Sequence, residues 1–74
     1  MIKLLMIADD FTGALDSGVK FAQSGASTIV ISQRAITEND LECGADVLVV
    51  DAQTRHLTAQ EAYRIVHDMT AVAA

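Results

Sequence analysis

The sequence predicts an α/β fold, the start of a doubly wound parallel sheet with the element order β-α-β-short α-β-α. Short apolar runs rich in Val, Ile and Leu alternate along the chain with segments whose apolar residues recur every three or four positions. No proline interrupts this pattern, and glycines stand where the helices are expected to end. Strands that alternate with helices are typical of a parallel sheet that is covered on both faces.

Three short segments are predicted to form the strands of this sheet. The first covers residues 2–8, an apolar run that ends at a pair of aspartates. The second, residues 28–31, consists of β-branched and aliphatic side chains, and the third, residues 46–51, is nearly continuous in Val and Leu between two aspartates. Such runs are typical of strands buried on both faces. Three strands with one open edge are expected to be part of a larger sheet.

Helices are predicted over residues 12–24 and from residue 58 onward, with a helix of one or two turns within residues 32–44. In the two longer helices, the apolar spacing forms one stripe that packs on the sheet. Each helix has residues suited to cap its start, and the first two also have a glycine suited to end them. The expected caps are Thr12 and Gly25 for the first helix, Thr37 with Asp40 and Gly44 for the second, and Thr58 with Glu61 for the third.

The apolar content favours a folded chain that contacts further protein. Hydrophobic residues make up 51% of the 74 residues, far more than a disordered segment carries. A chain of this size supports only a marginal core, so part of the apolar surface is expected to be covered by other protein. We therefore expect residues 1–74 to be the N-terminal part of a larger two-domain protein. Formation of a homo-oligomer would also bury such surface.

Charge and cysteine content exclude several classes of partner. A net charge of −5 with five scattered basic residues argues against nucleic-acid binding. The first apolar run is too short for a signal peptide or a membrane span, so no membrane partner is predicted. The single cysteine, Cys43, provides neither an internal disulfide nor a metal-ligand pattern, which suits a cytoplasmic protein. No metal site is predicted, and Cys43 is expected to be a small apolar filler.

Polar side chains follow the first and third predicted strands, at the edge of the sheet where α/β proteins bind ligands. They are Asp9, Asp10, Thr12 and Gly13 after the first strand, and Asp51, Thr54, Arg55 and His56 after the third. Because these two loops lie above strands that are otherwise apolar, they form the candidate site.

Asp9 and Asp10 are expected to point to opposite sides of the strand end and to have different roles. One carboxylate would accept hydrogen bonds from ligand hydroxyls or act as a general base, and both residues are candidates for the catalytic group. The other would cap the following helix or hold a cation. The alternative is that both simply complement the positive end of the helix dipole, as Asp16 is expected to do one turn later.

The remaining polar residues each allow a functional and a structural interpretation. Backbone N–H groups at Thr12 and Gly13 would hold an anion, or the two residues would form only a tight turn. Arg55 offers a planar fork for a ligand carboxylate, with an internal ion pair to a nearby aspartate as the alternative. His56 is suited to acid–base chemistry but is expected to be structural, and His67 is expected at the surface. No glycine-rich nucleotide motif is present.

Two segments resemble a known family. Residues 7–16, Ile-Ala-Asp-Asp-Phe-Thr-Gly-Ala-Leu-Asp, resemble the N-terminal signature of the four-carbon acid sugar kinase family. Residues 49–57, Val-Val-Asp-Ala-Gln-Thr-Arg-His-Leu, resemble its second motif, a strand that ends in Asp and is followed by a Ser/Thr-Arg pair. The resemblance implies the sugar-acid-binding N-terminal domain of a kinase that phosphorylates threonate, erythronate or their 3-oxo forms. It also implies ATP and Mg²⁺ as cofactors, bound mainly by a separate C-terminal nucleotide-binding domain, without which these residues would be inactive.

The same resemblance implies roles for individual residues. By motif position, Asp9 and Asp10 would contact substrate hydroxyls, and one of them would help to activate the hydroxyl that becomes phosphorylated. Arg55 would contact the substrate carboxylate, and Thr12 and Gly13 complete the predicted substrate-binding set. Phosphoryl transfer depends chiefly on positioning and on charge neutralisation, which such a pocket would serve.

A phospho-receiver domain is the alternative from a different class. Such a domain has an acidic pair after its first strand and a phosphorylated aspartate at the end of its third. Asp9, Asp10 and Asp51 follow this arrangement, so the acidic pair would hold Mg²⁺ and Asp51 would accept a phosphoryl group. The Thr-Gly and Thr-Arg pairs of the two loops have no purpose in a receiver. The kinase interpretation is therefore preferred.

Overall fold

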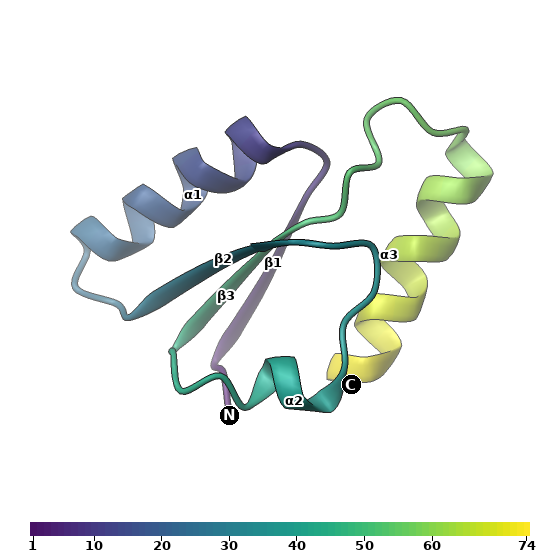
Figure 1. Ribbon diagram of the computed structural model, residues 1–74. Helices are drawn as coiled ribbons and strands as arrows, with labels where there is room; N and C mark the ends of the chain where they lie inside the picture. Colours follow the sequence, from purple (N-terminus) through teal and green to yellow (C-terminus); the bar gives the residue numbers. More distant parts are fainter.

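A computed structural model describes the whole chain, Met1–Ala74, and shows a parallel sheet with helices on both sides (Figure 1). The strands are β1 (Leu4–Ala8), β2 (Thr28–Ser32) and β3 (Val47–Asp51), and the helices are α1 (Phe11–Gln23), α2 (Glu38–Leu41) and α3 (Ala59–Ala73). The predicted α/β class and element order are confirmed. None of the helices combines the length and the apolar character needed to cross a lipid bilayer.

Strand β3 lies in the middle of the sheet, between β1 and β2, and both pairings are parallel. Every residue of β3 is buried, as its apolar run predicts. β1 is also predicted to be buried on both faces, but it is an edge strand in which most residues are half-buried and Leu4 is 42% exposed. The sheet therefore has two open edges, β1 and β2, rather than one.

The side chains of β3 alternate between two apolar cores, one on each face of the sheet. Val47 and Val49 pack with Ala14 of α1, whereas Leu48 packs with Met69 of α3. Helix α1 thus covers one face, and α2 and α3 cover the other, as Figure 1 shows. This two-sided cover is the doubly wound arrangement that the sequence predicts.

Helix α1 begins before Thr12, its predicted N-cap. Asp10 occupies the N-cap instead, and its Oδ1 accepts a hydrogen bond from the backbone N–H of Gly13 at 2.7 Å. Because the chain turns into the helix almost directly after β1, the first carboxylate in capping position takes this donor. Gly25 at the end of α1 and Gly44 shortly after α2 adopt φ values of 95° and 88°, the left-handed conformation that suits glycine.

The caps of the other two helices agree with the prediction. In α3, the Oγ1 of Thr58 accepts the backbone N–H of Glu61 at 3.2 Å and donates to its carboxylate at 2.8 Å. At the start of α2, the carboxylate of Asp40 accepts the backbone N–H of Thr37 at 2.8 Å. Cys43 is half-buried against the core beneath α3, as expected for a small apolar filler.

Candidate functional site

The carboxyl ends of the three strands lie level at one edge of the sheet, because Ala8 and Ser32 both pair with Asp51. β1 leads into α1 on one face and β3 leads into α3 on the other, so their connections diverge between neighbouring strands (Figure 1). In open α/β sheets, ligands bind at such a point. A cleft of about 330 Å³ opens here. It is lined by Asp9, Asp10, Phe11, Arg34, Asp51, Gln53, Arg55 and His56.

The structure brings most of the predicted site residues together, but not all of them. Those that line the cleft are Asp9, Asp10, Asp51, Arg55 and His56. Thr12 and Gly13 belong to the first turn of α1 and are not among the lining residues, and the N–H of Gly13 is already bonded to Asp10. Thr54 is buried beneath the cleft, at 9% exposure. His67 lies away from it on the surface of α3, beside the ring of Tyr63.

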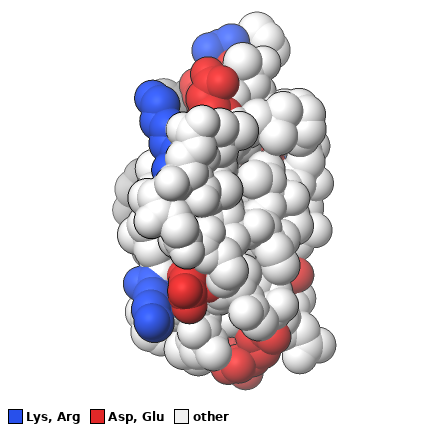
Figure 2. All heavy atoms as spheres, turned by 90° about the vertical axis from the view of Figure 1, so that its left-hand side faces the viewer, with Lys and Arg blue, Asp and Glu red and all other residues white.

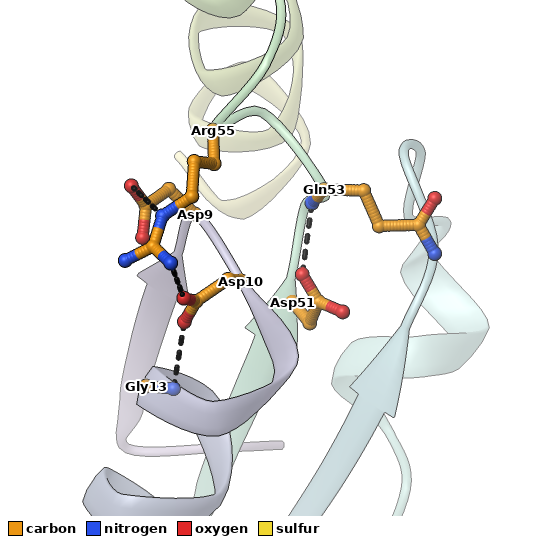
Figure 3. A network of polar contacts seen from close by, with 6 residues as sticks. All are labelled: Asp9, Asp10, Gly13, Asp51, Gln53 and Arg55. Carbon is orange, nitrogen blue, oxygen red and sulfur yellow. Dashed lines mark hydrogen bonds and ion pairs between the residues drawn. The ribbon is translucent and has the colours of Figure 1, made fainter.

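Arg55 joins the two aspartates that follow β1 (Figure 3). Its Nη1 lies 2.7 Å from Oδ2 of Asp10, and its Nε lies 3.9 Å from Oδ2 of Asp9. Both carboxylates therefore converge on one guanidinium, and the expectation that they point to opposite sides is wrong. Side-chain alternation applies within a strand, and both residues lie beyond Ala8, where β1 ends. The backbone N–H groups of Thr54 and Arg55 donate to the carbonyl of Asp9, which brings the arginine to this loop.

The two carboxylates nevertheless have different surroundings. The side chain of Asp10 is 23% exposed, because it caps α1 and makes the shorter contact with Arg55. The side chain of Asp9 is 59% exposed and makes only the longer contact, so most of its lone pairs face the solvent of the cleft. An ion pair with this exposure contributes about 0–1 kcal/mol. Its main effect is therefore to order the three side chains.

Asp51 forms a second network on the β2 side of the cleft. It is 3% exposed; its Oδ2 accepts the hydroxyl of Ser32 at 2.8 Å, and its Oδ1 accepts the backbone N–H of Gln53 at 2.9 Å. The side-chain amide of Gln53 also donates to the Ser32 hydroxyl at 2.8 Å. These bonds hold Gln53 at φ 57°, a left-handed conformation that costs a non-glycine residue about 1–3 kcal/mol. Strain of this kind, held by a buried carboxylate, is typical of functional sites.

Sequence reasoning missed three residues of the cleft, Phe11, Arg34 and Gln53. Arg34 lies in the loop after β2, and its Nη2 donates to the backbone carbonyl of Gln53 at 3.0 Å. The position of Arg34 could have been inferred from the sequence. In a parallel sheet all strands end at the same edge, so the loop after β2 belongs to the site as much as the loops after β1 and β3. The conformation of Gln53 has no signal in its residue type, since glutamine rarely adopts positive φ.

Comparison with known proteins identifies the family. The chain matches the family of the sugar-binding N-terminal domain over residues 4–74. It belongs to this family. The predicted resemblance to the N-terminal domain of four-carbon acid sugar kinases is thereby confirmed. No solved structure gives a significant match.

Three curated relatives of this sugar-binding domain are kinases. The chain is 43% identical to the D-threonate kinase of Cupriavidus necator over 58 residues, 78% of this chain and 14% of that protein. It is 38% identical to the D-threonate kinase of Salmonella typhimurium over 66 residues, 89% of this chain and 15% of that protein. It is 36% identical to the 3-oxo-tetronate kinase of the same organism over 64 residues, 86% of this chain and 15% of that protein. The chain therefore spans about one seventh of the length of these relatives.

The phospho-receiver alternative is not supported. It requires Asp9, Asp10 and Asp51 around one Mg²⁺ ion. No group of three or more His, Cys, Asp or Glu side chains lies close enough to hold a metal, and both oxygens of Asp51 are engaged with Ser32 and Gln53. The family is moreover that of a sugar-binding domain.

Proposed function

We propose that this chain is the substrate-binding portion of an ATP-dependent kinase that phosphorylates a four-carbon sugar acid of the threonate, erythronate or 3-oxo-tetronate type. One observation carries the proposal: in a sugar-binding domain related to such kinases, two carboxylates and a guanidinium converge where the strand connections diverge. Carboxylates accept hydrogen bonds from hydroxyls, and guanidinium groups donate to anionic oxygens, so the cleft suits a polyhydroxylated anion.

The exposure of each side chain suggests its role in binding or catalysis. Asp9 and Asp10 accept hydrogen bonds from the substrate hydroxyls, and Asp9, the more exposed and less engaged of the two, takes the proton of the hydroxyl that is phosphorylated. Arg55 contacts substrate oxygens with the N–H groups that it does not use on the aspartates. Thr12 and Gly13 contribute indirectly, by forming the first turn of α1 that Asp10 caps.

ATP and Mg²⁺ do not fit the residues of this chain. It has no glycine-rich phosphate loop, and it has no group of acids that could hold a metal ion. We assign both to a C-terminal nucleotide-binding domain of the same protein, where they would supply the phosphoryl group and neutralise its charge. Because the proposed kinase uses ATP as a substrate, we assign it to the cytoplasm.

The test is turnover by the full-length protein that contains this chain. With ATP and Mg²⁺, it is expected to consume at least one acid from a panel of threonate, erythronate and 3-oxo-tetronate stereoisomers, measured by coupled release of ADP. Arg55→Ala removes a charged donor of hydrogen bonds to substrate oxygens, so KM should rise about 10- to 100-fold with a smaller change in kcat.

The matched control is Arg64→Ala, which removes an exposed arginine of α3 that does not line the cleft. This variant should keep the wild-type KM and kcat. Absence of turnover across the whole panel would contradict the proposed function. An Arg55→Ala variant that lost kcat with an unchanged KM would contradict the role of this arginine in binding.

A further inference from the structure

The two arginines of the cleft differ in how far their charge is already balanced. Arg55 has carboxylate oxygens at 2.7 and 3.9 Å, from two aspartates. Arg34 has no ion pair within 4.0 Å anywhere in the chain, and its side chain makes a single hydrogen bond, to the neutral carbonyl of Gln53. Arg34 is thus the one guanidinium of the cleft whose charge no carboxylate balances.

One acid of the same cleft, Asp51, could balance that charge but makes no ion pair with Arg34. Asp51 lines the same cleft, but its two oxygens accept the Ser32 hydroxyl and the Gln53 N–H, and it makes no ion pair. The same network fixes the Gln53 backbone, whose carbonyl in turn orients Arg34. One N–H of the guanidinium is used for this contact, and the remaining donors are free for a ligand.

Two groups on opposite sides of the cleft match the hydroxyls and the carboxylate of a sugar acid. Figure 3 shows Arg55 on the β1 side, beside Asp9, and Gln53 reaching toward β2. The exposed carboxylate of Asp9, which has only the longer contact with Arg55, therefore lies with the β1 loop, and the guanidinium of Arg34 lies with the loop after β2. The cleft between them, about 330 Å³, is within the range of about 300–1,000 Å³ for small-molecule sites.

We propose that Arg34 is a specificity-determining residue that binds the substrate carboxylate, while Arg55 stays with the aspartates that bind the hydroxyls. This assignment rests on the proposed function. The family resemblance places the substrate carboxylate at Arg55, whereas this assignment places it at Arg34, on the other side of the cleft. A guanidinium held by a neutral carbonyl loses no ion pair when the ligand arrives. A ligand carboxylate bound to Arg55 would instead lie beside the carboxylates of Asp9 and Asp10 and be repelled by them.

The experiment compares a sugar acid with its neutral amide, which keeps every hydroxyl and lacks only the charge. Binding of threonate and threonamide to the full-length protein is measured by calorimetry for the wild type and for Arg34→Gln. The wild type should prefer the acid. Arg34→Gln should weaken binding of the acid about tenfold or more and change that of the amide less than about twofold, because a charged hydrogen bond is lost only with the acid.

Two further variants distinguish recognition from a structural role. Arg34→Lys should restore part of the preference for the acid, and Arg64→Gln should leave both affinities unchanged. Equal weakening of acid and amide in Arg34→Gln would overturn the assignment, since loss of the Gln53 contact would then explain the effect. A preference for the acid that survives in Arg34→Gln but disappears in Arg55→Gln would also overturn it. Wild-type protein that binds neither compound, across the acid panel, would overturn the proposed function together with this assignment.

Discussion

At the scale of single residues, Asp10 connects the fold to the site. Its Oδ1 caps α1 by accepting the Gly13 N–H, and its Oδ2 pairs with Arg55. Gly13 suits this arrangement, because a Cβ at that position would lie 2.8 Å from the capping oxygen and would force the Asp10 carboxylate to shift. A substitution at Asp10 therefore changes the stability of the helix and the order of the site together.

Substitutions at Asp10 can separate these two effects. Asp10→Asn keeps an N-cap oxygen but loses the charge, so the free energy of unfolding should fall by less than about 1 kcal/mol. Asp10→Ala loses cap and ion pair and should cost about 1–2 kcal/mol in urea unfolding followed by circular dichroism. Asp16→Ala, at an exposed acid of the same helix, should have little effect. Equal losses for the Asn and Ala variants would show that the cap contributes nothing.

The sequence predicted the conformation of individual residues correctly where neighbouring residues in the chain determine it. The capping pairs at Thr37 and Thr58 and the glycine turns follow from neighbours in the chain, and they were predicted correctly. The N-cap of α1 was misplaced because Asp10 and Thr12 are both good capping residues, and only the path of the chain after β1 decides between them. The convergence on Arg55 and the position of Arg34 depend on contacts between loops, which no local pattern contains.

At the scale of secondary-structure elements, a glycine sets how closely α1 approaches the sheet. Gly18 is buried against β2, and a Cβ there would lie 2.6 Å from Cγ2 of Val30. The apolar spacing of α1 predicts the buried positions Ala14 and Gly18, but Leu15 and Val19 of the same stripe are exposed. Periodicity carries no information on the order of strands, however, so it could not place β3 between β1 and β2.

Gly18→Ala should therefore destabilise the chain in spite of its better helix propensity. The gain in propensity is about 1 kcal/mol, whereas overpacking costs about 1–3 kcal/mol, so we expect a net loss of up to about 2 kcal/mol in urea unfolding. Val30→Ala removes the methyl group that the new Cβ would meet. The double variant should then lose at least about 0.5 kcal/mol less than the sum of the single variants. A Gly18→Ala protein as stable as the wild type would contradict the close approach.

At the scale of the whole molecule, much apolar surface is left exposed. Phe11, Leu15 and Val19 follow one another along α1 at 53%, 41% and 54% exposure. Figure 2 shows the side that carries α1, where uncharged residues fill the middle and charged side chains lie toward the margins. Both edge strands also have unpaired backbone groups. The high apolar fraction of the sequence predicts that apolar surface stays exposed, but it does not predict where that surface lies.

The isolated 74-residue chain is accordingly expected to self-associate or to be partly unfolded. Sedimentation should show a molecular mass that rises with concentration, and the double substitution Leu15→Lys with Val19→Lys should reduce the rise. Val66→Lys, at a less exposed position on α3, should have a smaller effect. A monomer with a sharp unfolding transition that is independent of concentration would contradict this expectation.

Because the three strands end at the same level, ligand preference can change through substitutions in the loops alone. Ala8, Asp51 and Ser32 form the last rung of the sheet, and Arg34, Gln53 and Arg55 lie in loops beyond it. The ladder of hydrogen bonds below that rung does not depend on which side chains these loops carry. A new acid could therefore be accommodated by exchanging a few loop residues while Asp10 and Asp51, which also hold the scaffold, stay constant. The loop residues that face the ligand are thus separate from the residues that hold the sheet, and protein engineers could vary the former without redesigning the latter.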